Sequence, residues 1–214
     1  MNQIEASLIL LGFSILSFGA HFLILQPRVI PVVNPTLWIE SDEVKIQVWH
    51  NKRVVLRRNE FRAVKNTERY RFKFKWSGFY GIKISLMSSD DTLLGIRSPM
   101  TRLSWIRYEV RFKETLRAGD RKTVILRYDL SDPKSTSKPY HLISYKHVLG
   151  CRRLTFRLAF PENGAPRKVY LIHYDSDEVV QKGLPVPFDD DTNEYHCEVA
   201  PEPGIKYSIE WQEI

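Results

Sequence analysis

The pattern of hydrophobic positions divides the chain into two parts. Residues 6–27 contain no Asp, Glu, Lys or Arg, and residues 7–25 within them are almost wholly apolar. Nineteen residues at 1.5 Å per residue form a helix of about 28 Å, close to the roughly 30 Å hydrocarbon core of a bilayer. The pattern therefore predicts a single transmembrane helix within residues 1–27.

From residue 44 onward the pattern alternates with a period of two, which is typical of strands with one buried face. The clearest example is residues 69–76, where aromatic side chains alternate with Arg and Lys. Similar runs, separated by Gly, Pro, Asn or Asp, occupy residues 44–48, 53–57, 82–86, 105–113, 124–130, 153–160, 168–174, 193–199 and 205–211. Residues 57–68 show little alternation, so we expect a loop there.

About ten short strands joined by turns predict an all-β fold, an antiparallel β-sandwich of immunoglobulin-like character behind the transmembrane helix. A barrel is the alternative, because closure depends on the pairing of the first and last strands. The expected domains are an anchor at residues 1–27, a linker or edge strand at residues 28–43, and the sandwich at residues 44–214.

Charge indicates how the chain is oriented in the membrane. It has 32 Lys and Arg against 25 Asp and Glu, and every basic residue follows the predicted helix, beginning at Arg28. The positive-inside rule then places the main domain in the cytoplasm of a single-pass cell-membrane protein. Two alternatives stay open: a cleaved signal peptide with its site near Gly19, and an apolar helix that docks into a protein partner.

Small and polar residues line one side of the predicted helix. Ser7, Ser14, Ser17 and His21 recur at spacings of seven, three and four residues, which returns them to one face. Such a face commonly packs against another helix, so Ser14, Ser17 and His21 are predicted to mediate homo-oligomerisation. Alternatively, His21 simply lies near the membrane interface.

The sequence contains none of the usual motifs of NTPases, metalloproteases, serine hydrolases or zinc ribbons. We therefore predict no enzymatic activity, no catalytic residue, no cofactor and no metal. The acidic run at residues 189–191 lacks EF-hand spacing and is interpreted as a solvated turn. Cys151 and Cys197 are expected to be reduced thiols.

The best candidate for a ligand-binding surface is the basic face of the strand at residues 69–76. Side chains two residues apart stand about 7 Å from each other along a strand, a spacing that suits successive phosphates. The predicted ligand-binding residues here are Arg69, Arg71, Lys73 and Lys75, extended by Lys83 on the strand expected to pair with them. A nucleotide or another anionic ligand would fit. The same charges would also serve to prevent edge pairing, or would lie against anionic lipid.

A second candidate surface is a predicted loop rich in aromatic and histidine residues. Tyr140 and His141 lie in it, close to Tyr145 and His147. Rigid aromatic side chains and mixed hydrogen-bonding groups commonly form binding surfaces. The alternative is a loop that packs over one end of the sandwich.

Several segments resemble β-sandwich modules of bacterial regulatory and conflict-associated proteins, which are largely uncharacterised. The resemblance rests on residues 76–78, 105–112, 116–120 and 154–161 and spans residues 61–211. It implies the fold and a recognition role, and it assigns no functional residue. One helix before a β-rich sensor domain is also similar in layout to transmembrane effectors of cyclic-oligonucleotide antiphage signalling.

Three functions agree with these observations. The first is a non-enzymatic, membrane-anchored recognition module that binds a soluble ligand or a protein partner. The second is a nucleotide-gated effector of antiviral defence that disrupts the membrane. The third is a secreted or periplasmic β-domain released by signal cleavage.

Overall fold

The computed structural model describes residues 34–211, except residues 50, 75–80, 89, 97–105, 132–138, 145–149, 162–165, 167 and 176–177. By its internal contacts the chain divides into two units, residues 1–31 and residues 32–214. Every described residue belongs to the second unit. The predicted anchor at residues 1–27, and its boundary with the predicted linker, lie outside the described residues.

The described residues form strands and no helix, which confirms the all-β prediction for this part of the chain. The strands are β1 (Leu37–Trp49), β2 (Lys52–Ala63), β3 (Thr67–Phe74), β4 (Ile82–Leu86), β5 (Thr92–Ile96), β6 (Ile106–Leu116), β7 (Arg121–Ser131), β8 (Tyr140–Ser144), β9 (Leu154–Ala159), β10 (Val169–Asp175), β11 (Glu178–Pro185), β12 (Phe188–Asp189), β13 (Glu194–Val199) and β14 (Lys206–Trp211).

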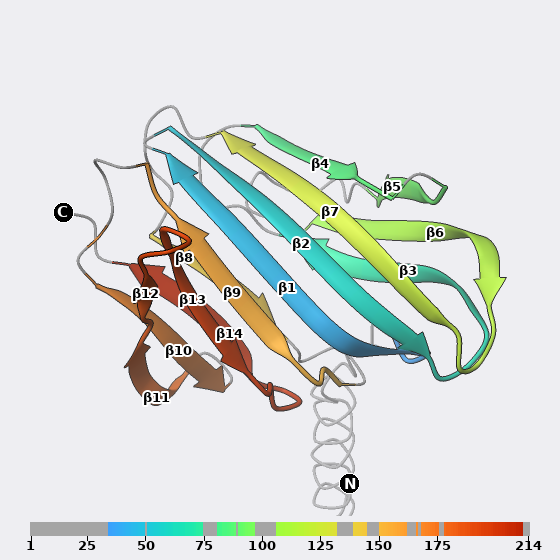
Figure 1. Cartoon of the computed structure of the whole chain (residues 1–214). Coiled ribbons are helices and arrows are strands. Elements are labelled where there is room, and N and C mark those ends of the chain that lie inside the picture. The colour runs from blue at the N-terminus through green and yellow to red at the C-terminus, as the bar shows by residue number, and fades with distance from the viewer. Residues whose placement is uncertain are drawn as a thin grey trace, which may run out of the picture. The chain divides into compact units, whose positions relative to one another are not determined.

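These strands make three open sheets (Figure 1). The largest has seven strands in the order β12-β13-β9-β1-β2-β7-β4, the second has four in the order β11-β10-β14-β8, and the third has three in the order β3-β6-β5. Open sheets are consistent with a β-sandwich. The prediction of an antiparallel sandwich needs one correction, because β9 runs parallel to β1 in the middle of the largest sheet.

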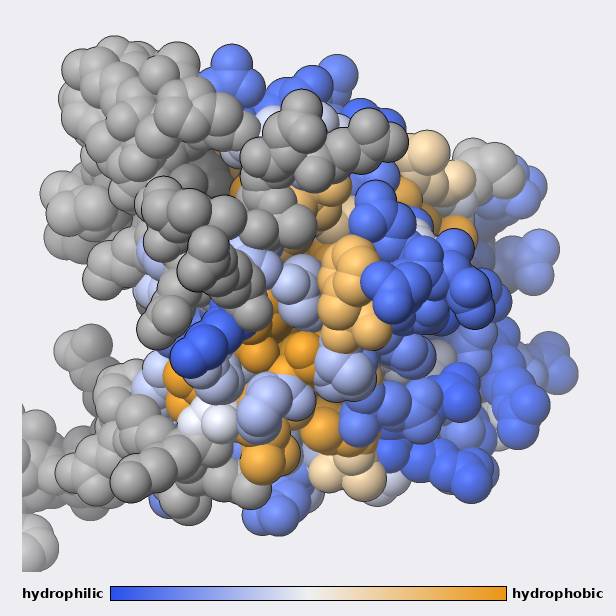
Figure 2. Space-filling model, turned by 60° about the vertical axis from the view of Figure 1, so that its left-hand side comes forward, coloured by the Kyte–Doolittle hydropathy of each residue, from blue (hydrophilic) through white to orange (hydrophobic). Residues whose placement is uncertain are grey.

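The core lies between the seven-stranded sheet and the two smaller sheets. Phe61 of β2 packs on Tyr70 of β3 with ring centroids 4.6 Å apart. Toward the other end, the guanidinium of Arg53 on β2 lies over the ring of Trp211 on β14, 4.7 Å from its centroid. Figure 2 turns the left-hand side of Figure 1 forward and shows hydrophobic residues gathered in the middle of that face, with hydrophilic residues over its right-hand side.

The predicted loop at residues 57–68 is wrong, because β2 continues to Ala63. The alternation persists there, but its inward positions include Arg57 and Asn59 instead of apolar residues. Arg57 lies inside the sandwich because it forms a two-pronged ion pair with Asp42 of β1, with Nε–Oδ1 and Nη2–Oδ2 distances of 2.9 and 2.6 Å. An inward position of β2 is thus occupied by an arginine with a charged partner on the neighbouring strand. The strand therefore lacks the apolar residue by which an alternating pattern is recognised in a sequence.

The first strand also begins earlier than residue 44, at Leu37. A register shift between Ile39 and Ser41 inserts one extra residue, Glu40, into β1. Such a bulge changes which parity of residues faces inward. The inward positions therefore run Leu37, Ile39 and then Asp42, which breaks the period of two.

Candidate functional site

Strands β3 and β6 each bury an aromatic face, which leaves their charged residues on the opposite side. Tyr70 and Phe72 of β3 are 2% and 6% exposed, as the alternation at residues 69–76 predicted. Phe72 contacts Tyr128 of β7 in the large sheet, with ring centroids 6.4 Å apart. Because successive side chains of a strand point to opposite faces, this packing directs the intervening Arg and Lys residues outward.

The outward residues of these two strands form a surface that we call the basic face. Its cations are Arg69, Arg71 and Lys73 of β3 and Arg107, Arg111 and Lys113 of β6. Glu109 of β6 is the acidic residue among them, while Glu68 and Glu114 lie at one end of the strands. The register sets Arg69 directly opposite Arg111 and Lys73 opposite Arg107, so two pairs of like charges face each other across the strands.

Glu109 is the centre of the basic face. Arg71 lies directly opposite it and donates from Nε to Oε2 at 2.9 Å. Arg111 Nη2 lies 3.5 Å from Oε1, and Arg69 Nη1 lies 3.8 Å from Oε2. The hydrogen bond from Arg71 and the charges of Arg71 and Arg69 hold the pKa of Glu109 below its ordinary value, against the opposing effect of burial.

The free edge of β3 is held by Asn34, the first described residue. The Asn34 side chain donates from Nδ2 to the carbonyl of Arg71 at 2.6 Å and accepts from the Arg71 N–H at Oδ1 at 2.7 Å. The two bonds reproduce the pattern of a neighbouring strand. They fix the backbone of Arg71 and hence the base of its side chain.

The outer face of the seven-stranded sheet also carries many charges, and several of its cations form ion pairs with acidic residues. Arg157 of β9 lies 3.2 Å from Glu43 of β1, and Arg127 lies 2.9 Å from Asp129 on β7. Lys45 and Glu194 form a further ion pair. This outer face carries both acidic and basic side chains, whereas the basic face has an excess of cations.

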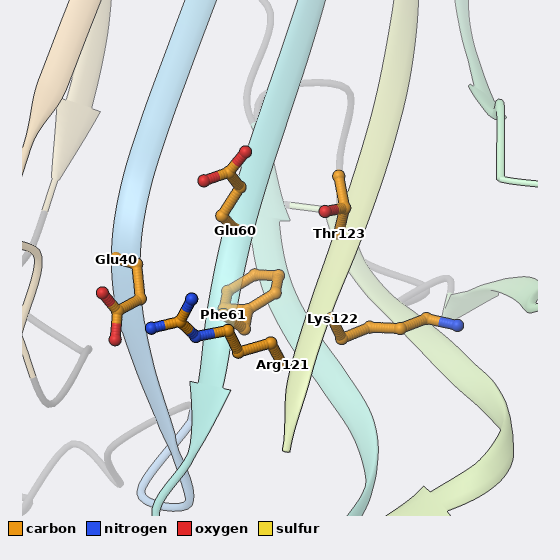
Figure 3. A pocket seen from close by; sticks show the side chains of 6 residues that line it. All are labelled: Glu40, Glu60, Phe61, Arg121, Lys122 and Thr123. Carbon is orange, nitrogen blue, oxygen red and sulfur yellow. The ribbon is translucent and has the colours of Figure 1, made fainter. Parts of the chain in front are cut away.

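A hollow of about 180 Å³ lies on this outer face, lined by residues of β1, β2 and β7. In Figure 3 the guanidinium of Arg121 extends toward Glu40, and Glu60 lies above them on β2. Lys122 points away, and it forms an ion pair with Asp91 at 2.8 Å. The hollow is lined by side chains of both charges, and these side chains do not all point toward one position.

The structure separates Lys83 from the basic face. Lys83 is on β4, which pairs with β7 in the large sheet and not with β3, and Lys83 lies opposite Asp129. The predicted extension of the basic surface by Lys83 is therefore wrong. Lys75 lies outside the described residues, and Arg69, Arg71 and Lys73 remain together.

Tyr140 and His141 lie on strand β8 and not in a loop, which corrects the prediction. They are neighbours in a strand, so they face opposite sides of the four-stranded sheet. His141 lies opposite the fully buried Ile209 of β14, on the inward side. Burial, with the charges of Arg53 and Arg57, lowers the pKa of His141 to about 3. The two side chains therefore cannot share one ligand surface.

Sequence reasoning did not join Arg107, Arg111 and Lys113 to the candidate surface. Their alternation with Tyr108, Val110 and Phe112 was visible, and it indicated a strand with a charged outer side. The missing information was that β6 pairs with β3, which brings the two charged sides together. The buried position of Glu109 also follows from this pairing.

The remaining predictions concern the anchor and the cysteines. Among the described residues, no helix has the length and hydrophobicity needed to cross a bilayer. Ser14, Ser17 and His21 lie outside this part of the chain. Both cysteines are free thiols, and burial raises the pKa of Cys197 to about 11, so it stays protonated near neutral pH.

Comparisons with known proteins give distant structural similarity alone. No protein-family model matches the sequence, and no curated protein matches it. A mutant M1 zinc metallopeptidase from Deinococcus radiodurans is 11% identical, with a TM-score of 0.46 over 84% of this chain and 43% of that chain. A putative nutrient-binding protein from Legionella pneumophila is 9% identical, with a TM-score of 0.41 over 84% of this chain and 68% of that chain. The chain spans less than half the length of the metallopeptidase.

Proposed function

We propose that the protein is a non-enzymatic, membrane-anchored recognition module that binds an anionic ligand through its basic face. Its N-terminal segment spans the cell membrane once, with the β-domain in the cytoplasm. Self-association through Ser14, Ser17 and His21 brings several domains together. The immunoglobulin-like character of the sandwich is part of the same proposal.

One observation carries the choice of surface: the charge of the basic face extends to the central strand of its sheet. Charges on the edge strand β3 are explained by protection against edge-to-edge pairing. Arg107, Arg111 and Lys113 lie on β6, which has a neighbour on each side and needs no such protection. Like charges directly opposite each other destabilise a sheet. An anionic partner accounts for their presence.

The geometry favours a ligand that lies over the surface. The basic face is the outer side of a sheet, and the aromatic residues of β3 are buried on its other side. Bases of a nucleic acid would find no aromatic platform among the described residues of this face, so recognition rests on charge.

Binding to a soluble polyanion tests this function. The full chain is placed in nanodiscs of neutral phosphatidylcholine and titrated with fluorescent polyphosphate at several salt concentrations. We expect binding that weakens steeply as salt rises, and at least tenfold weaker binding after Lys73→Gln combined with Arg107→Gln. A matched control, Arg127→Gln with Arg157→Gln on the outer face of the large sheet, removes the same charge. Equal effects of the two double variants would refute the assignment to the basic face.

The anchor is tested separately by alkaline carbonate extraction and protease protection in cells that express the full chain. We expect a full-length chain that stays in the membrane pellet with its β-domain shielded from external protease. A shortened chain outside the cytoplasm would instead support the secreted domain.

A nucleotide-gated membrane effector is the second candidate. Three arginines around Glu109 favour it, because guanidinium groups suit phosphate recognition. This function predicts that expression together with a nucleotide signal makes the membrane leak ions, whereas the recognition module binds without leakage. A dye-release assay on reconstituted vesicles separates the two.

A further inference from the structure

Three guanidinium groups converge on one carboxylate in the basic face. Arg69, Arg71 and Arg111 all lie within 3.8 Å of Glu109, whose side chain is 6% exposed. The arginine side chains themselves are 55%, 45% and 62% exposed. Each guanidinium carries five N–H donors, and Glu109 engages only some of them. The exposed parts present further donors to a ligand above the sheet.

The charge of this cluster is not balanced by Glu109. Three guanidinium groups against one carboxylate leave a net charge of about +2, and Arg69 and Arg111 are held directly opposite each other. A terminal phosphate group carries a charge of about −1.5 to −2 at pH 7, whereas an internal phosphodiester carries about −1. The terminal phosphate therefore matches the cluster best.

Glu109 gives the cluster a fixed geometry before any ligand arrives. It holds the Arg71 side chain by a hydrogen bond, and Asn34 holds the Arg71 backbone. Donors already in place lose less conformational entropy when the ligand binds. Glu109 is thus a positioning residue, although its negative charge alone would repel an anion.

We propose that Arg69, Arg71 and Arg111 form a binding site for a terminal, dianionic phosphate group, arranged around Glu109. The proposal rests on the proposed function, since it names the group that the basic face recognises. A soluble phosphate monoester and a lipid headgroup with a terminal phosphate share this chemistry.

The test compares two oligonucleotides that differ only in a 5′-phosphate. The full chain, in phosphatidylcholine nanodiscs, is titrated with each by fluorescence anisotropy at pH 7.5 and pH 5.0. We expect the 5′-phosphate to tighten binding about tenfold at pH 7.5, about the worth of one charge-assisted hydrogen bond. At pH 5.0 the preference shrinks, because a phosphate monoester with a second pKa near 6 takes up a proton while the arginines stay charged. Glu109 stays ionised there, because its pKa is lowered.

Matched variants locate the site. Arg111→Gln should abolish the preference for the 5′-phosphate, while Lys73→Gln, on the same face but outside the cluster, should weaken both oligonucleotides equally. Arg127→Gln should change neither. A 5′-phosphate preference that survives Arg111→Gln, or its absence from the unmodified chain, would overturn the proposed site.

The outcomes also separate this site from the proposed function. If both oligonucleotides bind equally, the basic face binds anions but the phosphate site is wrong. If neither binds and polyphosphate does not bind either, the proposed function fails as well. Nanodiscs containing phosphatidic acid or phosphatidylglycerol identify the source: competition by phosphatidic acid alone indicates a lipid terminal phosphate, and competition by neither indicates a soluble ligand.

Discussion

At the scale of single residues, the ion pair between Asp42 and Arg57 joins two charged groups inside the sandwich. The Asp42 side chain is fully buried and that of Arg57 is 16% exposed. Burial alone would lower the pKa of Arg57, but the charge and hydrogen bonds of Asp42 raise it above its ordinary value. Arg57 therefore stays charged within the protein, and its charge is stabilised by Asp42.

We predict that Asp42→Asn destabilises the protein by about 3–5 kcal/mol, because it leaves the Arg57 charge buried without its partner. Urea unfolding of the full chain in detergent, followed by tryptophan fluorescence, measures the change. The control is Glu60→Gln, which breaks the exposed pair with Arg58 and should cost less than about 1 kcal/mol. Similar losses of stability in the two variants would show that the ion pair between Asp42 and Arg57 contributes no more than an exposed pair.

His141 gives the protein a predictable dependence on pH. Its pKa is about 3 in the folded chain, against an ordinary value of about 6.5. Between these pH values the unfolded chain takes up a proton that the folded chain does not, so stability falls as the pH drops from about 6.5 toward 3. We expect His141→Leu to reduce this fall between pH 7.0 and pH 4.5, measured as the urea midpoint. His196→Gln, on the outer face of β13, is the control. If the urea midpoint of His141→Leu falls between pH 7.0 and pH 4.5 as much as that of the unmodified chain, His141 is not the source of the pH dependence.

At the scale of elements, sequence patterns predicted the strands whose inward residues are apolar. β3, β6 and β7 were recognised because Phe72, Val110 and Leu126 follow a strict alternation and are all buried. The later part of β2 was missed because Arg57 and Asn59 occupy inward positions. The local pattern shows only the polarity of each residue, and it does not reveal that a polar side chain has a partner on another strand.

The candidate surface was partly predictable for a related reason. Arg69 and Arg71 lie outward as the alternation required, but Lys83 belongs to another sheet and Arg111 was left out. Both errors concern which strands pair. Strand pairing depends on contacts between residues that are distant in the sequence. The local pattern of a single sequence does not reveal which strands make these contacts.

The edge of β3 provides the prediction at this scale. Asn34→Ala removes two hydrogen bonds to the Arg71 backbone, so we expect faster hydrogen exchange at the Arg71 amide and a loss of about 1 kcal/mol in stability. The control is Asn66→Ala, because Asn66 accepts from the Ala118 N–H at an exposed position. Exchange by mass spectrometry with peptide resolution compares the two sites. Unchanged exchange across β3 in Asn34→Ala would show that Asn34 does not hold this edge.

At the scale of the whole molecule, the outer face of the seven-stranded sheet and the basic face of the three-stranded sheet differ in how their charges are arranged. On the outer face of the large sheet, cations such as Arg157 and Arg127 have acidic partners. On the basic face, three arginines share the single carboxylate of Glu109. Because the net charge of +7 is thus unevenly distributed, salt should affect binding through the basic face far more than it affects folding.

The last prediction concerns the independence of the β-domain. The residue contacts divide the chain at residues 31 and 32, and all described strands belong to residues 32–214. A chain that lacks residues 1–31 keeps Asn34 and every strand pairing described above. We therefore expect it to retain the urea midpoint of the full chain and to move from the carbonate-resistant membrane pellet to the soluble fraction. If it is unfolded, residues 1–31 contribute to the core, which would favour the apolar helix docked into protein over the membrane anchor. If it folds but still sediments with membranes, the basic face alone holds the domain on anionic lipid, a result that high salt would reverse.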